Sequence, residues 1–343
     1  MKNSKISIKK HIISFFIFLL FGLANAEQGF SNANILKVAT YNIGMLDFLT
    51  VTVPYIKERE ESLQEEMAWY LTTNDIDVLA LQEVWTKNSQ ENLQNIPGYI
   101  LLLAPDKMFA PLGHKTGLAF LVKETIIHEN KDFEFKFIDF QTREGLICLA
   151  GSLCERGILQ ISFKKNGILF SIFNTHLTPL ISSIDKRKNQ MNEIAQMMNE
   201  PATNEDVIIL AGDLNLSLEV GELREGDDGT LESWLQNGKL YDDFFAKGDS
   251  CFDAYFTAFN KPSYFTQDRD NNLTAQASSA MIKEPNQRLD HIFYCLADNN
   301  DTDNPFSEIE TKAIFTDATI FLEDGNTVHL SDHFGVETTF KFK

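Results

Sequence analysis

Hydrophobic and polar positions along this chain follow two different periods. Short apolar runs rich in β-branched and aromatic residues, separated by polar turns, predict strands. These strands are expected at 35–41, 77–82, 117–122, 133–140, 145–149, 159–163, 168–174, 207–211, 289–294, 311–315 and 335–342. Helical spacing predicts helices at 56–71 and 185–198, whereas the polar stretch 260–287 is expected to be a long loop. The opening order of strand, helix and strand indicates a layered α/β fold.

Polar side chains stand at the ends of these predicted strands. They are Asn42, Glu83, His176, Asp213, Asn215, Asp290, Asp332 and His333. A buried strand has no packing reason to finish repeatedly in carboxylate, amide or imidazole groups. If these ends meet at one edge, they form an acidic metal site beside two histidines. Such a site is the equipment of a hydrolase that acts on a phosphate ester.

Two pairs of these residues have types and spacings that suit particular roles. Glu83 and Asn42 would offer oxygen ligands to Mg²⁺, although Glu83 alone equally suits a helix cap and Asn42 a turn. Asp213 and Asn215 are two positions apart, so in an extended backbone they face the same reacting centre. Asp213 would orient or deprotonate a water and Asn215 would donate to a charged phosphate oxygen. A plain turn is the structural alternative for this pair.

The histidines are the candidates for proton transfer. His176 and His333 are two of only seven histidines, and both lie beside apolar β-type residues. An isolated histidine of this kind is more often a structural residue. Asp290 is a candidate to hold His333 as imidazolium, and Asp332 either reaches a metal or caps a turn.

The N-terminal segment has the pattern of a secretory signal peptide. Four lysines in the first ten residues precede an apolar stretch at 12–23, and small residues at 24–26 offer a cleavage site. The stretch is shorter than the roughly 20 residues of a membrane-spanning helix, so a retained anchor is the less favoured alternative. We therefore expect a signal peptide at 1–26 and a secreted or periplasmic mature protein. Its single catalytic domain would span 27–343, without a transmembrane segment.

The chain is strongly acidic. Its formal charge of −19 becomes −23 once the four signal lysines are removed. Such a surface repels polyanions and offers no basic stripe for a phosphate backbone, so nucleic acid is disfavoured as a partner.

Cysteine usage fits an oxidising compartment. The chain carries Cys148, Cys154, Cys251 and Cys295. Cys148 and Cys154 have a spacing that a hairpin could close, but four cysteines permit three connectivities and the sequence leaves the choice open.

The ordered motifs resemble the endonuclease/exonuclease/phosphatase superfamily, and within it the neutral, Mg²⁺-dependent sphingomyelinases. The superfamily motifs are Tyr41-Asn42-Ile43-Gly44, Leu81-Gln82-Glu83-Val84-Trp85, Asn174-Thr175-His176-Leu177, Gly212-Asp213-Leu214-Asn215, Arg288-Leu289-Asp290-His291 and Leu330-Ser331-Asp332-His333. The subgroup resemblance rests on Val53-Pro54-Tyr55-Ile56-Lys57 followed by Arg59, Glu83-Val84-Trp85, His114-Lys115-Thr116-Gly117-Leu118, Arg187-x-x-Gln190 and Phe252-Asp253-Ala254-Tyr255. Thr116 stands where many members have Ser, and His291 stands where an aromatic residue is usual.

The resemblance implies a four-layer α/β sandwich of two packed mixed β-sheets flanked by helices, with the active site where the strand ends meet. It implies Glu83, Asn42 and Asp332 on the metal side, with Mg²⁺ as cofactor and Mn²⁺ or Co²⁺ as substitutes. The implied catalytic residues are His333, Asp213, Asn215, His176 and Asp290. Lys115 would join Asn215 and His176 in binding the substrate.

The implied reaction is hydrolysis of sphingomyelin to ceramide and phosphocholine at a membrane surface. A zwitterionic headgroup suits an acidic protein better than DNA or a polyphosphoinositide does. Apolar segments at 108–112 and 256–265 are candidates to enter the membrane, although such clusters are more often core. The alternatives are a secreted Mg²⁺-dependent endonuclease, an inositol-phosphate phosphatase, and a non-catalytic toxin or binding subunit with this fold. The phosphatase is less favoured because this chain lacks the tryptophan that usually precedes Gly212-Asp213 there.

Overall fold

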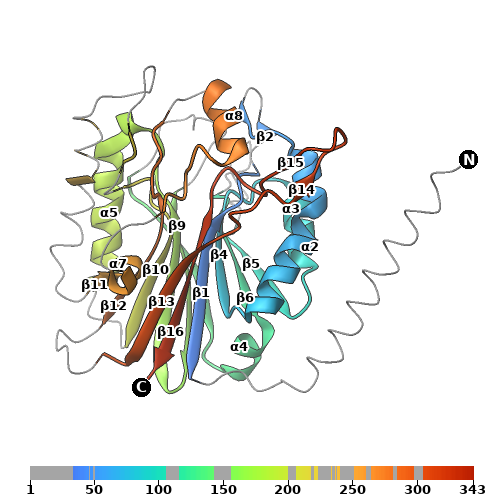
Figure 1. Ribbon diagram of the computed structural model, residues 1–343. Helices are drawn as coiled ribbons and strands as arrows, with labels where there is room; N and C mark the ends of the chain where they lie inside the picture. The colour runs from blue at the N-terminus through green and yellow to red at the C-terminus, as the bar shows by residue number, and fades with distance from the viewer. Residues whose placement is uncertain are drawn as a thin grey trace, which may run out of the picture. The chain divides into compact units, whose positions relative to one another are not determined.

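The strands of this protein form two six-stranded mixed sheets that pack face to face (Figure 1). The computed structural model describes residues 34–45, 47–48, 51–105, 116–142, 156–199, 206–217, 220–222, 233, 236, 238–239, 251–259, 264–280, 284–296 and 304–343. Leu36–Lys343 forms one unit, to which everything below refers. The expected signal peptide, the strand at 145–149, the segment 108–112, Lys115, Cys148 and Cys154 lie outside the described residues.

The first sheet has the strand order β13-β16-β1-β4-β6-β5. Its strands are β1 (Ile35–Asn42), β4 (Val78–Gln82), β5 (Tyr99–Leu103), β6 (Ala119–Lys123), β13 (Phe306–Ile314) and β16 (Gly335–Phe342). β1 and β4 are parallel, with Asn42 beside Gln82, so both strands end at the same edge. The pairs β4–β6, β5–β6 and β13–β16 are antiparallel.

The second sheet has the strand order β11-β12-β10-β9-β8-β7. Its strands are β7 (Glu134–Asp139), β8 (Gly157–Lys165), β9 (Ile168–His176), β10 (Val207–Asp213), β11 (Cys251–Asp253) and β12 (Asp290–Leu296). The parallel pair β9–β10 ends at one edge, and β12 runs antiparallel to β10 and begins at that edge. The hairpin between β8 and β9 turns at Asn166 and Gly167, both with positive φ, as the Asn-Gly pair favours in tight hairpin turns.

Helices surround the two sheets, with the two long ones, at Ile56–Asn74 and Ile184–Asn199, on the outer faces (Figure 1). They are α2 (Ile56–Asn74), α3 (Lys87–Gln94), α4 (Glu124–Glu129), α5 (Ile184–Asn199), α7 (Ala254–Phe259) and α8 (Asn272–Ala280), with a short 3₁₀ turn η2 (Ile181–Ser183). Two small ribbons complete the described elements: β2 (Asp47–Phe48) with β3 (Val51–Thr52), and β14 (Ile320–Phe321) with β15 (Thr327–Val328).

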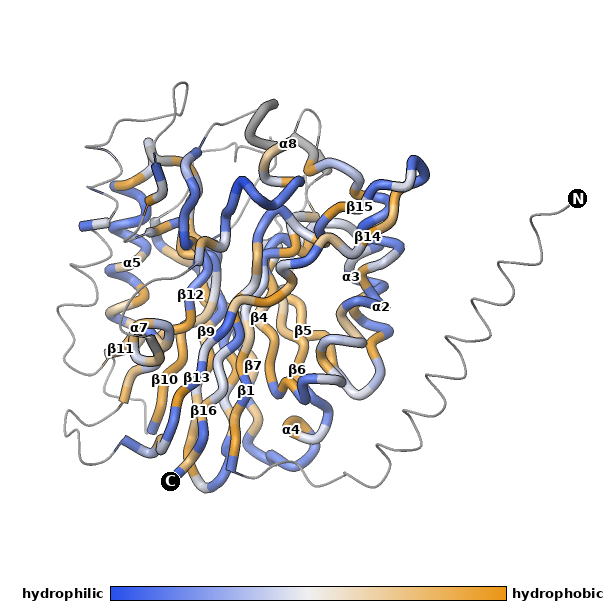
Figure 2. Tube along the Cα trace, viewed as in Figure 1, coloured by the Kyte–Doolittle hydropathy of each residue, from blue (hydrophilic) through white to orange (hydrophobic). Residues whose placement is uncertain are grey.

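Alternate residues of each strand face different layers. In β4, Val78 and Ala80 join the apolar cluster between the sheets, whereas Leu79 and Leu81 join the cluster beneath α2. In β10, Ile209 faces the other sheet, whereas Leu210 packs in the cluster that includes residues of α5. Strands buried on both faces read as continuous apolar runs, which Figure 2 shows as orange tubes in the centre. The four-layer α/β sandwich implied by the sequence is confirmed.

The structure corrects the expectation of an uninterrupted loop at 260–287. Helix α8 lies within it, and Asn271 caps its start by accepting hydrogen bonds from the backbone N–H groups of Leu273 and Thr274. Helix α3 was also not predicted, because its sequence is almost entirely polar and shows no apolar period. Its start is fixed by Thr86, whose side chain accepts from Ser89 N.

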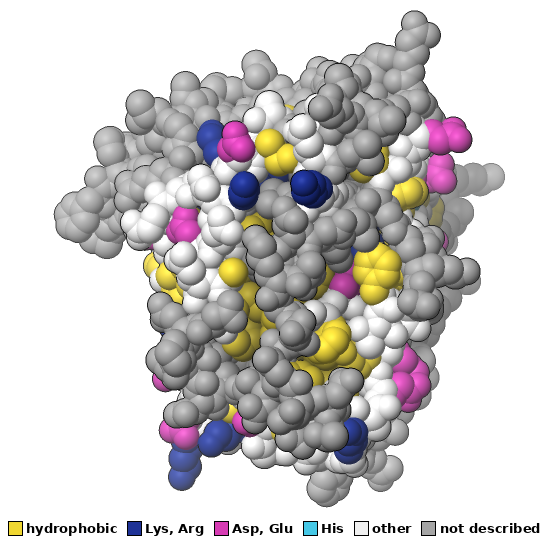
Figure 3. Space-filling view, turned by 90° about the vertical axis from the view of Figure 1, so that its left-hand side faces the viewer, with side chains coloured by type: hydrophobic (Ala, Val, Ile, Leu, Met, Phe, Trp, Pro, Cys, Tyr) yellow, Lys and Arg dark blue, Asp and Glu magenta, His cyan; other side chains and the backbone are white. Residues whose placement is uncertain are grey.

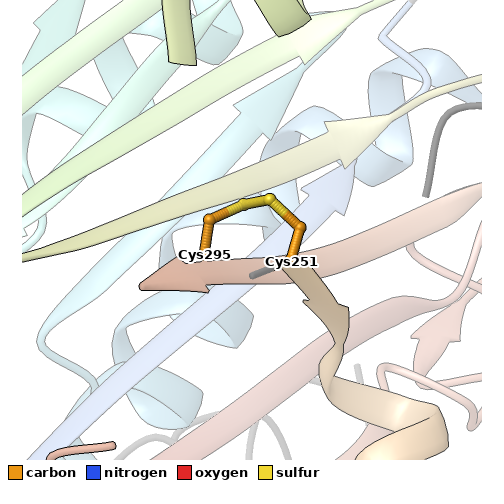
Figure 4. The surroundings of a disulfide bond; sticks show 2 residues. All are labelled: Cys251 and Cys295. Carbon is orange, nitrogen blue, oxygen red and sulfur yellow. A yellow bond between two sulfur atoms is a disulfide. The ribbon is translucent and has the colours of Figure 1, made fainter. Parts of the chain in front are cut away.

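A disulfide bond joins Cys251 of β11 to Cys295 of β12, which are directly opposite each other in the antiparallel pair (Figure 4). This pairing is one that the sequence left open. It encloses a sequence separation of 44 residues, and removal of such a cross-link costs about 2–5 kcal/mol. Within the described residues, no helix is both long enough and apolar enough to cross a membrane.

Candidate active site

Three of the predicted residues stand in a row across the second sheet. Asp213 is the last residue of β10, and its register partners are His176 on β9 and Asp290 on β12. Asp213 shares its side of β10 with Ile209 and Ala211, which face the first sheet. Register partners share a face, so all three polar side chains point into the space between the sheets, at its edge.

A glycine brings the first two strands of this row together. Gly212 has φ 148°, and a Cβ built there would lie 2.1 Å from the carbonyl oxygen of Thr175. Any side chain would therefore push β9 away from β10 and separate His176 from Asp213. Only glycine is compatible with this approach.

The first sheet contributes Asn42 and Glu83 to the same edge. Asn42, the last residue of β1, donates through Nδ2 to Asp213 Oδ2 at 3.0 Å and to Glu83 Oε1 at 3.3 Å. Glu83 follows β4 with φ 58°, a left-handed conformation that costs a glutamate about 1–3 kcal/mol. The amide of Asn42 therefore connects the first sheet to the second where the carboxylates of Glu83 and Asp213 approach each other.

His333 is held by Asp290. The Nδ1 of His333 lies 2.8 Å from Asp290 Oδ2, and both residues are buried. Burial opposes the charged imidazole, but the neighbouring Asp290 and its hydrogen bond raise the pKa of His333 well above its usual value. This shift favours the imidazolium form, in which Nδ1 donates to Asp290 and Nε2 carries the second proton.

Two hydroxyl groups fix the loops on either side of this pair. Thr266 Oγ1 accepts from the backbone N–H groups of Leu289, at 2.9 Å, and Asp290, at 3.1 Å. Ser331 Oγ donates to Asn42 O at 2.6 Å and accepts from His333 N at 3.2 Å. Ser331 thereby joins the loop that carries His333 to the end of β1.

His176 is neutral and lies next to Asp213. Burial lowers the pKa of His176 well below its usual value, and the nearby charges of Arg156 and His333 lower it further. Its Nε2 is 3.4 Å from Asp213 Oδ2, which is a contact between a neutral ring and a carboxyl group and not an ion pair. Arg156, at the start of β8, donates to His176 O at 3.2 Å and places a permanent cation beside the imidazole.

Asp213 has the pKa of a general base. Burial raises its pKa to about 7, and the charge of Asp290 acts in the same direction, while His333 and the hydrogen bond from Asn42 oppose the shift. Asn215 adopts a positive φ of 49°, donates its backbone N–H to Asp213 Oδ1 at 2.9 Å and donates Nδ2 to Leu177 O at 3.0 Å. A carboxyl group near pKa 7 is suited to accept a proton at neutral pH.

Glu83 and Asp332 form the part of the site that suits a divalent cation. Both are only partly buried, so solvent reaches them, and burial together with the charge of Asp332 raises the pKa of Glu83. A cation between them would relieve this repulsion, and carboxylate oxygens are the ligands that Mg²⁺ prefers. Asn42 Oδ1 accepts from Gly44 N at 3.0 Å, so the structure shows Asn42 linking carboxylates, and its predicted role as a ligand stays a prediction.

A second group of possible ligands lies deeper. Asp213, Asp290 and His333 present ligand atoms within 4.8 Å of one another. A protonated imidazole is not a metal ligand, and Nδ1 of His333 is already bonded to Asp290. The deeper group is thus already joined by a hydrogen bond, whereas Glu83 and Asp332 present carboxylates that solvent reaches.

Polar side chains beneath the site lock the two sheets together. Gln82 donates to Asn174 Oδ1 at 2.7 Å, and Asn174 Nδ2 donates to Leu81 O at 3.0 Å and Ala119 O at 2.8 Å. These bonds connect β9 to β4 and β6, one layer below His176 and Glu83. They fix the distance between the two halves of the site.

Three residues of the surroundings received no predicted role: Arg59, which appears above only as part of a subgroup motif, and Arg156 and Thr266, which were not singled out. For Arg59 a signal existed, because its spacing to Leu63 and Met67 places it on the buried face of the predicted helix. A charged residue on an apolar face is unusual and indicates a buried partner. Arg156 and Thr266 gave no comparable signal, since their neighbours come from distant segments.

A buried ion pair supports the strand that carries Asp290. Arg288 donates to Asp253 Oδ2 at 2.8 Å, and its guanidinium lies 5.0 Å from the ring centre of Tyr255. Burial opposes ionisation of Asp253, but the neighbouring His291 side chain, 3.9 Å away, and the charge of Arg288 hold its pKa below the usual range.

We expect Asp253→Asn to lower the free energy of unfolding at pH 7 by about 3–5 kcal/mol, because it removes the carboxylate that compensates Arg288. A lowered folded-state pKa stabilises the fold above the unfolded pKa of about 3.9, and this stability is lost as the pH falls. Urea unfolding at pH 7 and pH 3 should therefore show a smaller difference between wild type and variant at pH 3. Equal stabilities at pH 7 would show that the pair contributes nothing.

Comparisons with known proteins agree with this geometry. A sequence model described as the Endonuclease/Exonuclease/phosphatase family matches residues 39–333. The Mus musculus protein named Sphingomyelin phosphodiesterase 2 is 21% identical over 193 residues, covering 53% of this chain and 42% of that protein. The chain thus matches less than half the length of this curated relative.

Solved structures share the fold at low identity. SmcL has a TM-score of 0.59 with 18% identity, covering 90% of this chain and 99% of its own. The D. rerio TDP2 complexed with single strand DNA product has a TM-score of 0.60 with 19% identity and the same coverage. A Bacteroides thetaiotaomicron mannosyl-6-phosphatase has a TM-score of 0.57 with 20% identity, covering 88% of this chain and 98% of its own.

Proposed function

Because this chain belongs to the endonuclease/exonuclease/phosphatase family, we propose that it is a secreted, Mg²⁺-dependent phosphodiesterase that hydrolyses sphingomyelin to ceramide and phosphocholine. The observation that carries the reaction type is the meeting of Asn42, Glu83, Asp213 and His333 at one edge of the two sheets. The choice of sphingomyelin rests on the subgroup motifs, on the similarity to the mouse protein and on the charge of the chain.

The proposed chemistry separates the base from the acid. Asp213, with a pKa near 7, accepts a proton from the water that attacks phosphorus. The P–O bond to ceramide breaks, and the imidazolium of His333 gives its proton to the departing oxygen. Asn215 and the neutral His176 bind the phosphoryl oxygens, and Arg156 compensates their charge. The attacking water thus loses its proton to Asp213, and ceramide gains its proton from His333.

Glu83 and Asp332, with Asn42 beside them, would hold the Mg²⁺. When bound, a divalent cation stabilises negative charge on the phosphate oxygens. Mn²⁺ or Co²⁺ would be accepted by the same oxygen ligands, because nothing in the donor set excludes them.

Charge argues against nucleic acid as the substrate. On the face shown in Figure 3, the described residues carry separate basic and acidic side chains, without a continuous basic band. With a formal charge of −19, the chain repels a long polyanion at physiological ionic strength. The similarity to TDP2 reports the fold at 19% identity and carries no substrate over.

Secretion is part of the proposal. The signal-peptide pattern at 1–26 and the disulfide between Cys251 and Cys295 both fit an oxidising compartment outside the cytoplasm. The single catalytic domain from 27 to 343 is proposed on the same pattern.

An exposed aromatic residue marks a surface suited to lipid. Phe321 of β14 is 79% exposed, and Trp69 of α2 is 57% exposed. The β14–β15 ribbon precedes the loop that carries His333 in the sequence. Of the segments expected to enter a membrane, 108–112 lies outside the described residues, and Phe256 packs against Arg288 instead.

Phe321→Ser is expected to reduce turnover of sphingomyelin in vesicles about tenfold, since a phenyl ring contributes about 1.5–3 kcal/mol when buried in an apolar phase. Turnover of a short, soluble phosphodiester should not change. Phe135→Ser is the matched control, because Phe135 is an exposed aromatic residue, 38% exposed, on β7 of the second six-stranded sheet. An equal loss with both substrates, or with Phe135→Ser, would contradict a lipid-binding role.

The substrate is tested by incubating the purified protein with sphingomyelin vesicles, phosphatidylcholine vesicles, supercoiled plasmid and soluble phosphoinositides, each with Mg²⁺ and with chelator. We expect phosphocholine release from sphingomyelin in the presence of Mg²⁺ alone. Plasmid nicking without lipid turnover would assign the chain as an endonuclease, and phosphate release from phosphoinositides would assign it as a phosphatase. Inactivity on all four, with metal present, would favour a non-catalytic binding subunit.

A further inference from the structure

A fully buried guanidinium lies behind the proposed metal ligands. Arg59, the fourth residue of α2, is 0% exposed and is one of the largest fully buried side chains. Within the described part of the chain it donates to backbone carbonyls: Nε to Leu330 O at 2.8 Å, one terminal nitrogen to Ile43 O at 2.7 Å and Gly44 O at 2.9 Å, and the other to Pro54 O at 3.4 Å. A guanidinium that donates to carbonyl oxygens in this way orders the backbone segments that carry them, rather than forming a simple ion pair.

The carbonyls belong to the two loops that carry the metal side of the site. Ile43 and Gly44 directly follow Asn42, and Leu330 is two residues before Asp332. The two loops touch at Gly44, where a Cβ would lie 2.2 Å from Asp332 Oδ1 and 3.2 Å from the Arg59 guanidinium. Arg59 therefore holds the two loops at the point where the Asp332 carboxylate passes over Gly44.

Helix α2 gives Arg59 a rigid base. The helix starts after Tyr55, which has φ 56°, and the backbone N–H of Arg59 bonds to Tyr55 O at 3.0 Å. The same buried face continues through Leu63 and Met67 into the cluster beneath the first sheet. The packed helix and the full burial of Arg59 restrict movement of the guanidinium.

We propose that Arg59 is a positioning residue that sets the separation between the Asn42–Glu83 side and the Asp332 side of the metal site. This inference rests on the proposed metal-dependent function. Neither Arg59 nor its carbonyl partners need touch metal or substrate, so the role is to shape the ligand set.

Charge and geometry predict opposite effects for the removal of Arg59. A positive charge behind the ligands repels a divalent cation, so its loss would favour Mg²⁺ if charge dominated. Loss of the hydrogen bonds frees two loops and weakens binding if geometry dominates. Residues that orient metal ligands typically change metal affinity by about 10–100-fold when replaced. We assign the larger effect to geometry, because Arg59 bonds three separate segments simultaneously.

The test is calorimetric Mg²⁺ titration of the full chain, which needs no substrate. Arg59→Lys keeps the charge but lacks the planar fork, and Arg59→Met loses both. Both variants are expected to bind Mg²⁺ about 10–100-fold more weakly than wild type. Lys165→Met is the matched control, because Lys165 forms a buried pair with Asp77 Oδ2 at 2.6 Å, at the other end of β8 from Arg156. It should lower the melting temperature and leave Mg²⁺ affinity unchanged.

Three results would overturn the proposal. Tighter or unchanged Mg²⁺ binding by Arg59→Met would show that charge dominates or that the residue has no role. Wild-type affinity in Arg59→Lys would show that charge alone suffices. Equal weakening by Lys165→Met would reduce the effect to lost stability. If the wild-type chain does not bind Mg²⁺, the proposed metal site itself is wrong, and this inference fails with it.

Chemical rescue covers the case in which the variants fold poorly. Arg59→Ala leaves a cavity of the shape of the missing side chain, and free guanidinium at low concentration should restore Mg²⁺ affinity and raise the melting temperature. Urea at the same concentration has a similar shape but no charge, and is expected to restore less. Failure of guanidinium to restore either quantity would contradict the proposal.

Discussion

His333→Gln is expected to lower kcat for the phosphodiester substrate by about 10²–10⁴-fold, which is the contribution of a well-placed general acid. Glutamine can still donate to Asp290, so the buried carboxylate keeps a partner and the fold should remain intact. It cannot deliver a proton to the departing oxygen. The measurement is kcat and KM at saturating Mg²⁺, together with a melting curve of each protein.

His329→Gln is the matched control for this prediction. His329 and His333 lie in the same segment and are both 7% exposed, but His329 bonds to Asn272 and Thr316 O, away from the site. Its replacement should change stability and not kcat. A variant of His333 with at least a tenth of wild-type kcat would exclude it as the acid.

Asp290→Asn tests the same assignment through pH. Asp290 raises the pKa of His333, so its removal should let His333 lose its proton at a lower pH. If imidazolium is the active form, the alkaline limb of the kcat/KM profile moves to lower pH in the variant. An unmoved limb, or a shift to higher pH, would contradict the acid role of His333.

Glu83→Gln is expected to abolish measurable Mg²⁺ binding and to reduce turnover by at least about 100-fold. In the metal-free protein the same change should raise the melting temperature. Burial and Asp332 make the charged form of Glu83 unfavourable there, and a neutral amide removes that cost. Added Mg²⁺ should then raise the melting temperature of wild type and have no effect on the variant.

Glu60→Gln separates this effect from the loss of a buried glutamate in general. Glu60 is 8% exposed, accepts from Asn88 at 3.0 Å and bonds to Thr86, close to α3. This variant should be less stable than wild type and bind Mg²⁺ normally. Unchanged Mg²⁺ affinity in Glu83→Gln would move the metal to the deeper group of Asp213, Asp290 and His333.

Much of the site could be predicted from the two-residue period of the strands. Val38 and Asn42 lie on one face of β1, as do Ile209 and Asp213 of β10, so the apolar pattern already points the polar ends into the space between the sheets. The two-residue period does not reveal which strands are neighbours in space. Asn42 contacts Asp213 across 171 positions of sequence, and no local signal encodes that distance.

The residues whose roles escaped prediction act through backbone atoms. Arg59 binds carbonyls of Ile43, Gly44 and Leu330, and Thr266 binds the N–H groups of Leu289 and Asp290. Backbone partners leave no trace in the side-chain pattern, so such residues are visible only in three dimensions.

The most direct test of the account is whether Glu83 and His333 act as parts of one centre. Turnover of the preferred phosphodiester should be measured for wild type, Glu83→Gln, His333→Gln and the double variant, at saturating Mg²⁺ and equal protein concentration. Residues that serve one reaction step are strongly non-additive, so the double variant should be about as slow as the slower single variant. Near-wild-type turnover in either single variant, or losses that multiply in the double variant, would contradict the account.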